Sequence, residues 1–127
     1  MPCERVLIVD DNAMSLKLAA FVMRAHGYDV SVVVDAESAL EAIHRQRPDV
    51  VLVDIQLPGI DGLELVRQLR ADVASQDLLV IAVTAYAMKG DHERALAAGC
   101  NGYITKPIDT RTLASTIASA LKDAAPR

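Results

Sequence analysis

The sequence is poor in aromatic residues and in cysteines. Its 127 residues contain no tryptophan, one phenylalanine and three tyrosines, and Cys3 and Cys100 carry its two thiols. Surfaces that stack nucleic-acid bases need aromatic rings beside cations, so this composition argues against one. Two cysteines without C-x-x-C spacing make no disulfide framework and favour a reducing compartment, so we expect a cytoplasmic protein.

Long hydrophobic runs and an excess of positive charge are also missing. No apolar run approaches the ~20 residues needed to cross a bilayer, and the amino terminus has no signal-peptide pattern. With 13 basic and 17 acidic residues, the net charge is −4. Such a chain does not attract a phosphate backbone. We therefore expect no membrane insertion and no nucleic-acid partner.

What the sequence does contain is aliphatic: the hydrophobic residues make up 52% of it. This length and composition predict a single domain over residues 1–127, with a core at about 4–123. Short, continuous, β-branched runs recur, which is typical of strands buried on both faces of a parallel sheet. They lie at residues 6–9, 30–34, 50–53, 78–83 and 103–104.

Helical patterns separate these runs, so the order is strand–helix five times over. The first pattern places Leu18, Val22 and Ala25 on one face and ends at His26-Gly27; we also expect Phe21 to pack. The second helical pattern ends at Pro48, and the remaining three lie over residues 65–69, 91–98 and 113–121. This alternation predicts an α/β fold, a parallel sheet with helices on both faces.

Candidate site residues follow four of the five predicted strands. They are Asp10, Asp11 and Asn12, then Asp54, then Thr84, then Thr105, Lys106 and Pro107. Because ligands bind beyond the carboxyl ends of parallel strands, these side chains should meet at one edge of the sheet.

Helix capping accounts for some of these residues but not for all. Asp35 precedes a helical pattern and is predicted to be an N-cap without further chemistry, and Asn12 should cap the first helix. Asp54 lies seven positions before Asp61, which is the better cap for the helix beginning at Gly62. Capping therefore leaves the carboxylates of Asp10, Asp11 and Asp54 unexplained.

Three converging carboxylates repel one another and favour a cation. At ~4 Å and an effective dielectric near 20, each pair costs about 4 kcal/mol, and Lys106 would offset one charge. Oxygen ligands of this kind prefer Mg²⁺ to zinc or copper. The sequence therefore predicts a magnesium site.

Three stretches resemble the receiver domain of bacterial two-component response regulators, over roughly residues 4–123. They are Val9-Asp10-Asp11-Asn12, residues 57–62 (LPGIDG) and residues 98–107 (AGCNGYITKP). The resemblance implies a flavodoxin-like (β/α)5 three-layer sandwich with five parallel strands in the order 2-1-3-4-5.

The resemblance also implies a role for each site residue. Asp54 would be the phosphoacceptor; Asp11, Asp54 and the Gln56 carbonyl would bind Mg²⁺, with Asp10 acting through water. Lys106, the Thr84 hydroxyl and the Ala85 amide would contact the phosphoryl oxygens, and Thr84 with Tyr103 would form the switch.

The partners implied are a sensor histidine kinase or a histidine phosphotransfer protein, and a downstream protein. The latter would bind the face formed by the helix over 91–98, the strand at 103–104 and the helix over 113–121. The resemblance is to stand-alone, DivK-like regulators, expected as a monomer or a weak homodimer that is not an enzyme beyond self-phosphorylation and self-dephosphorylation.

Other functions stay open or are disfavoured. A receiver module of a hybrid histidine kinase would look the same, and a scaffold that acts without phosphorylation is not excluded. A phosphohydrolase needs a second acid where Gln56 stands, and a flavodoxin-like cofactor carrier needs a phosphate cradle where Asp10 and Asp11 would repel phosphate.

Overall fold

Strands and helices alternate along the chain, as the sequence predicts. The computed structural model describes residues 4–55, 62–84, 89–105 and 109–124. The described strands are β1 (Arg5–Val9), β2 (Asp29–Val33), β3 (Val50–Asp54), β4 (Leu79–Thr84) and β5 (Gly102–Thr105). The described helices are α1 (Ala13–Ala25), α2 (Ala36–Arg45), α3 (Gly62–Ala71), α4 (Lys89–Ala98) and α5 (Leu113–Ala124).

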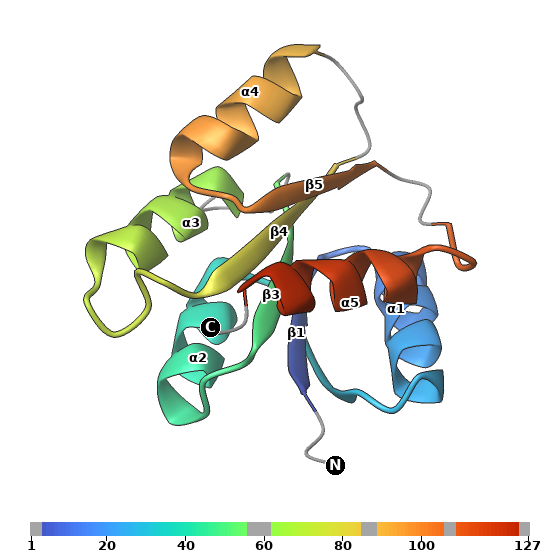
Figure 1. The fold of residues 1–127 in the computed structure, drawn as a ribbon. Helices are drawn as coiled ribbons and strands as arrows, with labels where there is room; N and C mark the ends of the chain where they lie inside the picture. Colours follow the sequence, from blue (N-terminus) through green and yellow to red (C-terminus); the bar gives the residue numbers. More distant parts are fainter. Residues whose placement is uncertain (1–3, 56–61, 85–88, 106–108, 125–127) are drawn as a thin grey trace.

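All five strands form one parallel sheet in the order β2-β1-β3-β4-β5 (Figure 1). This confirms the expected flavodoxin-like order. The winding direction reverses between β1 and β3, and open α/β sheets bind ligands beyond the strand ends at such a point. The topology therefore places the ends of β1 and β3 side by side at the expected site.

The core has two halves because successive strand residues point to opposite faces. In β1, Val6 and Ile8 pack with α1 and α5, whereas Leu7 and Val9 pack with α2 and α3. Figure 1 shows α1 and α5 on one side of the sheet and α2, α3 and α4 on the other. Burial on both faces explains why the strands read as continuous apolar runs. None of the described helices is both long and apolar enough to span a membrane.

The predicted buried face of α1 is wrong. Val22 is buried, but Leu18 and Ala25 are exposed, and the Phe21 side chain is 73% exposed instead of packed. The helix buries a neighbouring stripe, made of Leu16, Ala19, Ala20, Val22 and Met23. Nearly every position of α1 is apolar or small, so the sequence permits several stripes, and packing on the sheet selects one of them.

Two of the three predicted N-caps, Asn12 and Asp35, are present, and the third, Asp61, lies outside the described residues. The Asn12 side-chain oxygen accepts a hydrogen bond from the Ser15 backbone N–H at 3.0 Å, and Asp35 Oδ1 accepts one from Ser38 at 2.8 Å. At the other end of α1, Gly27 has a φ of +90°, which glycine adopts without strain. The Asn12 cap sets where α1 begins, directly after the two aspartates that follow β1.

Removing the Asp35 cap should destabilise the chain in a pH-dependent way. Hydrogen bonds from the backbone and side chain of Ser38 lower the pKa of Asp35 below its ordinary value of 3.8. A lowered pKa stabilises the fold above pH 3.8, and this contribution is lost as the pH falls through the folded-state pKa. In thermal unfolding, Asp35→Ala should lower Tm by about 3–5 °C at neutral pH.

The difference in Tm between the wild type and Asp35→Ala should shrink as the pH falls below 3.8. Asp35→Asn is the control, because asparagine keeps the capping acceptor and should keep most of the Tm at neutral pH. A Tm difference that stays constant from neutral to acidic pH would contradict this role for the Asp35 charge.

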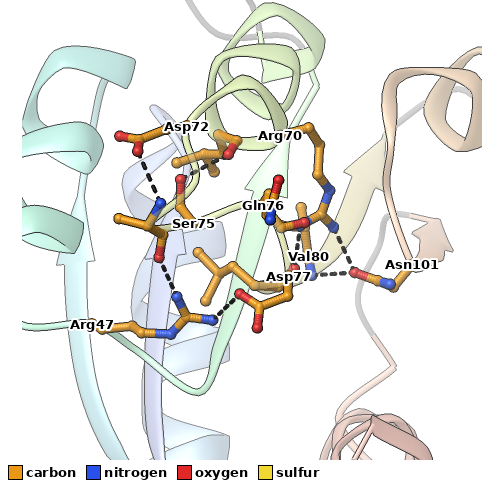
Figure 2. A network of polar contacts seen from close by, with 11 residues as sticks. Arg47, Arg70, Asp72, Ser75, Gln76, Asp77, Val80 and Asn101 are labelled. Atoms are coloured by element: carbon orange, nitrogen blue, oxygen red, sulfur yellow. Dashed lines mark hydrogen bonds and ion pairs between the residues drawn. The ribbon is translucent and has the colours of Figure 1, made fainter.

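A polar network ties the far end of α3 to the sheet. Arg70 Nε donates to the Gly99 carbonyl at 2.9 Å. Its two terminal nitrogens donate to the Gln76 and Leu78 carbonyls and to Asn101 Oδ1 (Figure 2). Burial lowers the pKa of Arg70 from its ordinary value, although a guanidinium stays charged at neutral pH. Arg70 thus connects α3, the segment entering β4 and the turn between α4 and β5.

Candidate functional site

The strand register brings the predicted site residues to one edge of the sheet. Val9 pairs with Val53, Asp54 pairs with Val83 and Thr84 pairs with Thr105. Asp10 directly follows Val9, so it leaves β1 beside the end of β3. The prediction that the strand ends converge is therefore confirmed for the described members of the set.

Backbone hydrogen bonds extend beyond the paired strands and hold the two buried aspartates. The Asp10 N–H donates to the Val33 carbonyl at 3.2 Å, and the Ile55 N–H donates to the Val83 carbonyl at 3.0 Å. One carboxylate oxygen of Asp10 also accepts a hydrogen bond from the Asn12 N–H at 2.9 Å. These hydrogen bonds fix the backbone positions of Asp10 and Asp54 at the ends of their strands.

Asp10, Asp11 and Asp54 form one acidic cluster. Each offers a carboxylate oxygen, and these oxygens lie within 4.8 Å of one another. Asp10 and Asp54 are 3% and 4% exposed, whereas Asp11 is exposed to solvent. Two charges 4.8 Å apart repel by about 3–4 kcal/mol at an effective dielectric near 20. A cation between these oxygens would remove that repulsion.

The donor set suits magnesium. All three groups are carboxylates, the ligand type that Mg²⁺ prefers, and no histidine or thiol is among them. One carboxylate is exposed, which leaves access for the water molecules that Mg²⁺ usually retains. The cluster thus fits the predicted ion by the number and chemistry of its oxygen donors.

Thr84 and Tyr103 lie on neighbouring strands. Thr84 is fully buried at the end of β4, and Tyr103 pairs with Ala82, two residues back along β4. Tyr103 is partly buried against the core that faces α2 and α3. It also lines a hollow of about 280 Å³ with Ile104 and Leu113, at the start of α5. Thr84 is therefore at the carboxyl edge on β4, the neighbour of β3, and Tyr103 lies near the same edge on β5, one strand further out.

Several predicted site residues fall outside the described part of the chain. They are Gln56, Ala85, Lys106 and Pro107. Their expected contacts with Mg²⁺ and the phosphoryl group stay predictions.

Gly62 lies beside the backbone of the acidic cluster, and sequence reasoning gave it no role there. Its N–H donates to the Ile55 carbonyl at 3.3 Å, and its α-carbon lies against the backbone of Asp54. A glycine at the first position of a helix, shortly after a strand-end aspartate, was the available signal. Its meaning depends on how α3 packs against β3, and the sequence alone does not give this.

Comparison with known proteins places the chain among response regulators. It is 44% identical over 119 residues to the polar-differentiation response regulator DivK of Brucella anthropi, covering 94% of this chain and 97% of that protein. It is 43% identical, with the same coverage, to DivK of Brucella ovis.

Solved structures agree with the fold. A CheY-like receiver domain protein from Methanospirillum hungatei has a TM-score of 0.88 and 30% identity, covering 97% of each chain. The receiver domain of the sensor histidine kinase PA1611 from Pseudomonas aeruginosa has a TM-score of 0.87 and 33% identity, covering 95% of this chain and 99% of that one. That structure has a magnesium ion coordinated in its active site cleft.

The sequence model of the response regulator receiver domain family matches residues 6–118, which is most of the sequence. This match and the identity to both DivK proteins show that the chain belongs to the receiver domain family of two-component response regulators.

Proposed function

We propose that this chain is a phosphorelay protein that accepts a phosphoryl group on Asp54. The donor is a phosphohistidine of a sensor kinase or of a histidine phosphotransfer protein. The observation that carries the proposal is the position of the Asp54 carboxylate: it is 4% exposed, at the end of a central strand, and within 4.8 Å of two further carboxylates. Membership of the receiver family supports the same function.

The acidic cluster supplies the magnesium ligands in this proposal. Asp11 and Asp54 hold the ion directly together with the Gln56 carbonyl, and Asp10 acts through bound water. When bound, Mg²⁺ neutralises charge on the phosphoryl oxygens. Two of the three carboxylates are buried, so their charges are poorly screened by solvent and attract a cation strongly.

The transfer step needs a nucleophile in line with the bond that breaks. A carboxylate oxygen of Asp54 forms the new bond to phosphorus while the phosphorus–nitrogen bond of the donor breaks, and its electron pair stays on the imidazole nitrogen. Phosphoryl transfer mainly requires such alignment and neutralisation of the equatorial oxygens. Lys106, the Thr84 hydroxyl and the Ala85 amide hold those oxygens.

Phosphorylation then changes the packing near β5. The phosphoryl group adds about −1.5 to −2 charges at neutral pH. Thr84 moves toward it, and Tyr103 turns into the space that Thr84 leaves, which alters the face formed by α4, β5 and α5. The closeness of the two residues on paired strands supports this switch, and the altered face is where a downstream protein would bind.

A receiver module within a hybrid histidine kinase is the second candidate context. The observation in its favour is the 33% identity to the receiver domain of the kinase PA1611. The chemistry at Asp54 would be the same in either context, so the assay below tests both.

Incubation with a small phosphodonor tests the proposal directly. We expect the intact mass of the protein to rise by one phosphoryl group when acetyl phosphate and Mg²⁺ are both present, because the aligned carboxylate needs the ion to offset charge. Omitting Mg²⁺ or chelating it should remove the increase. An unchanged mass under all conditions would leave the phosphorylation-independent scaffold as the better explanation.

A further inference from the structure

Gly62 lies against the backbone of the residue that carries the central carboxylate. A β-carbon built on Gly62 would be 2.3 Å from the Asp54 carbonyl oxygen, 2.6 Å from the Ile55 α-carbon and 2.9 Å from the Asp54 carbonyl carbon. The first distance is about 1 Å short of the 3.4 Å at which ordinary contact begins. Any side chain here would push the start of α3 away from the end of β3.

This contact differs from those of the other described glycines. A β-carbon at Gly99 or Gly102 would meet flexible side chains, of Arg70 and Ile81 respectively, and one at Gly90 would meet nothing within 4 Å. At Gly62 all three obstructing atoms are backbone, so no rotamer change relieves the clash. Unusual backbone dihedral angles do not explain this close approach. The described glycines with positive φ are Gly27 and Gly99, and Gly62 is not one of them.

The contact bears on the acidic cluster through the Asp54 backbone. The atoms that Gly62 approaches belong to Asp54 itself and to Ile55, the last described residues held to β4 through Val83 before α3 begins. Metal sites need their ligands within about 0.5 Å of the working geometry. A displacement of about 1 Å, divided between the start of α3 and the Asp54 backbone, would therefore change the spacing of the Asp54 carboxylate from those of Asp10 and Asp11.

We propose that Gly62 is a positioning residue for the metal site: its missing side chain lets α3 approach β3 closely enough to set the Asp54 carboxylate for Mg²⁺ over Ca²⁺. The inference rests on the proposed function, since it assumes that the acidic cluster binds Mg²⁺. The choice between the ions follows from their geometry. Mg²⁺ needs near-octahedral ligands at about 2.0–2.1 Å, whereas Ca²⁺ accepts flexible arrangements at about 2.3–2.6 Å.

The test compares Gly62→Ala with two glycine controls by isothermal titration with Mg²⁺ and with Ca²⁺. Gly62→Ala should weaken Mg²⁺ binding by about 10–100-fold, as the loss of supporting contacts does in other metal sites. Its ratio of Mg²⁺ to Ca²⁺ affinity should fall by about threefold or more, because Ca²⁺ tolerates the altered spacing. A loss of general stability alone would not change this ratio.

The controls separate position from stability. Gly90→Ala adds a methyl group to open space in α4 and should leave both affinities unchanged. Gly27→Ala strains the backbone at a φ of +90° far along the chain from the cluster, so it should lower Tm while the folded protein keeps its Mg²⁺ affinity.

A measurement on the wild type covers the case in which Gly62→Ala does not fold. The Gly62 amide, bonded to the Ile55 carbonyl, should exchange its hydrogen more slowly when Mg²⁺ is saturating, whereas the Gly27 amide should not change. Wild-type Mg²⁺ affinity retained by Gly62→Ala, or an unchanged Gly62 exchange rate, would overturn the inference. Absence of Mg²⁺ binding by the wild type would instead overturn the proposed function.

Discussion

Asp54→Asn should abolish phosphoryl uptake from a small phosphodonor. The amide lacks the anionic oxygen that attacks phosphorus, so the intact mass should not increase even at saturating Mg²⁺. Asparagine has nearly the shape of aspartate, so the variant is expected to fold. The wild type and the variant are compared by mass spectrometry over the same time course, with circular dichroism to verify folding.

Asp35→Asn is the matched control for Asp54→Asn. Asp35 also follows a strand of the sheet, but it caps α2 through its bond to Ser38 and takes no part in the acidic cluster. Its asparagine variant should take up one phosphoryl group as the wild type does. Mg²⁺-dependent phosphorylation of Asp54→Asn would show that another residue is the acceptor.

Arg70→Met should be among the most destabilising single substitutions of a charged residue in this chain. The guanidinium donates to the carbonyls of Gly99, Gln76 and Leu78 and to the Asn101 side chain. Methionine fills similar volume but removes the donor from the three carbonyls, whereas Asn101 Oδ1 keeps its hydrogen bond from the Val80 N–H. We expect the free energy of unfolding to fall by about 2–4 kcal/mol, measured by urea denaturation.

Arg67→Met provides the comparison within the same helix. Arg67 is exposed and has a 3.4 Å ion pair with Glu64 on the surface of α3. An exposed pair of this kind contributes little, so the loss should stay below about 0.5 kcal/mol. Equal losses for Arg67→Met and Arg70→Met would mean that the network in Figure 2 does not stabilise the fold.

The resemblance and the residue pattern together predicted the strand–helix order and the edge at which the site forms. Strands buried on both faces must be apolar at successive positions, and this is visible without coordinates. The parallel arrangement then requires that residues following the strands, such as Asp10 and Asp54, share one edge. The strand order itself came from the resemblance, because apolar runs alone do not indicate which strands are neighbours in the sheet.

Side-chain surroundings were less predictable. In α1 the apolar residues permit more than one buried stripe, and the predicted face containing Leu18 was wrong because packing against the sheet buries Leu16 instead. Nothing in the sequence indicated that Cys100 is buried. Burial raises the pKa of its thiol to about 11. Such properties depend on which neighbours surround a residue after folding.

The sequence by itself determined the elements of this protein and the type of chemistry at their ends, because periodicity, caps and strand-end carboxylates are local properties. Tertiary structure alone decided which distant groups touch: that Asp11 and Asp54 come within 4.8 Å, that Arg70 reaches Gly99 and Asn101, and that Gly62 lies on the Asp54 backbone. These contacts join segments far apart in the chain. They form only when the strand order and the helix positions are fixed together.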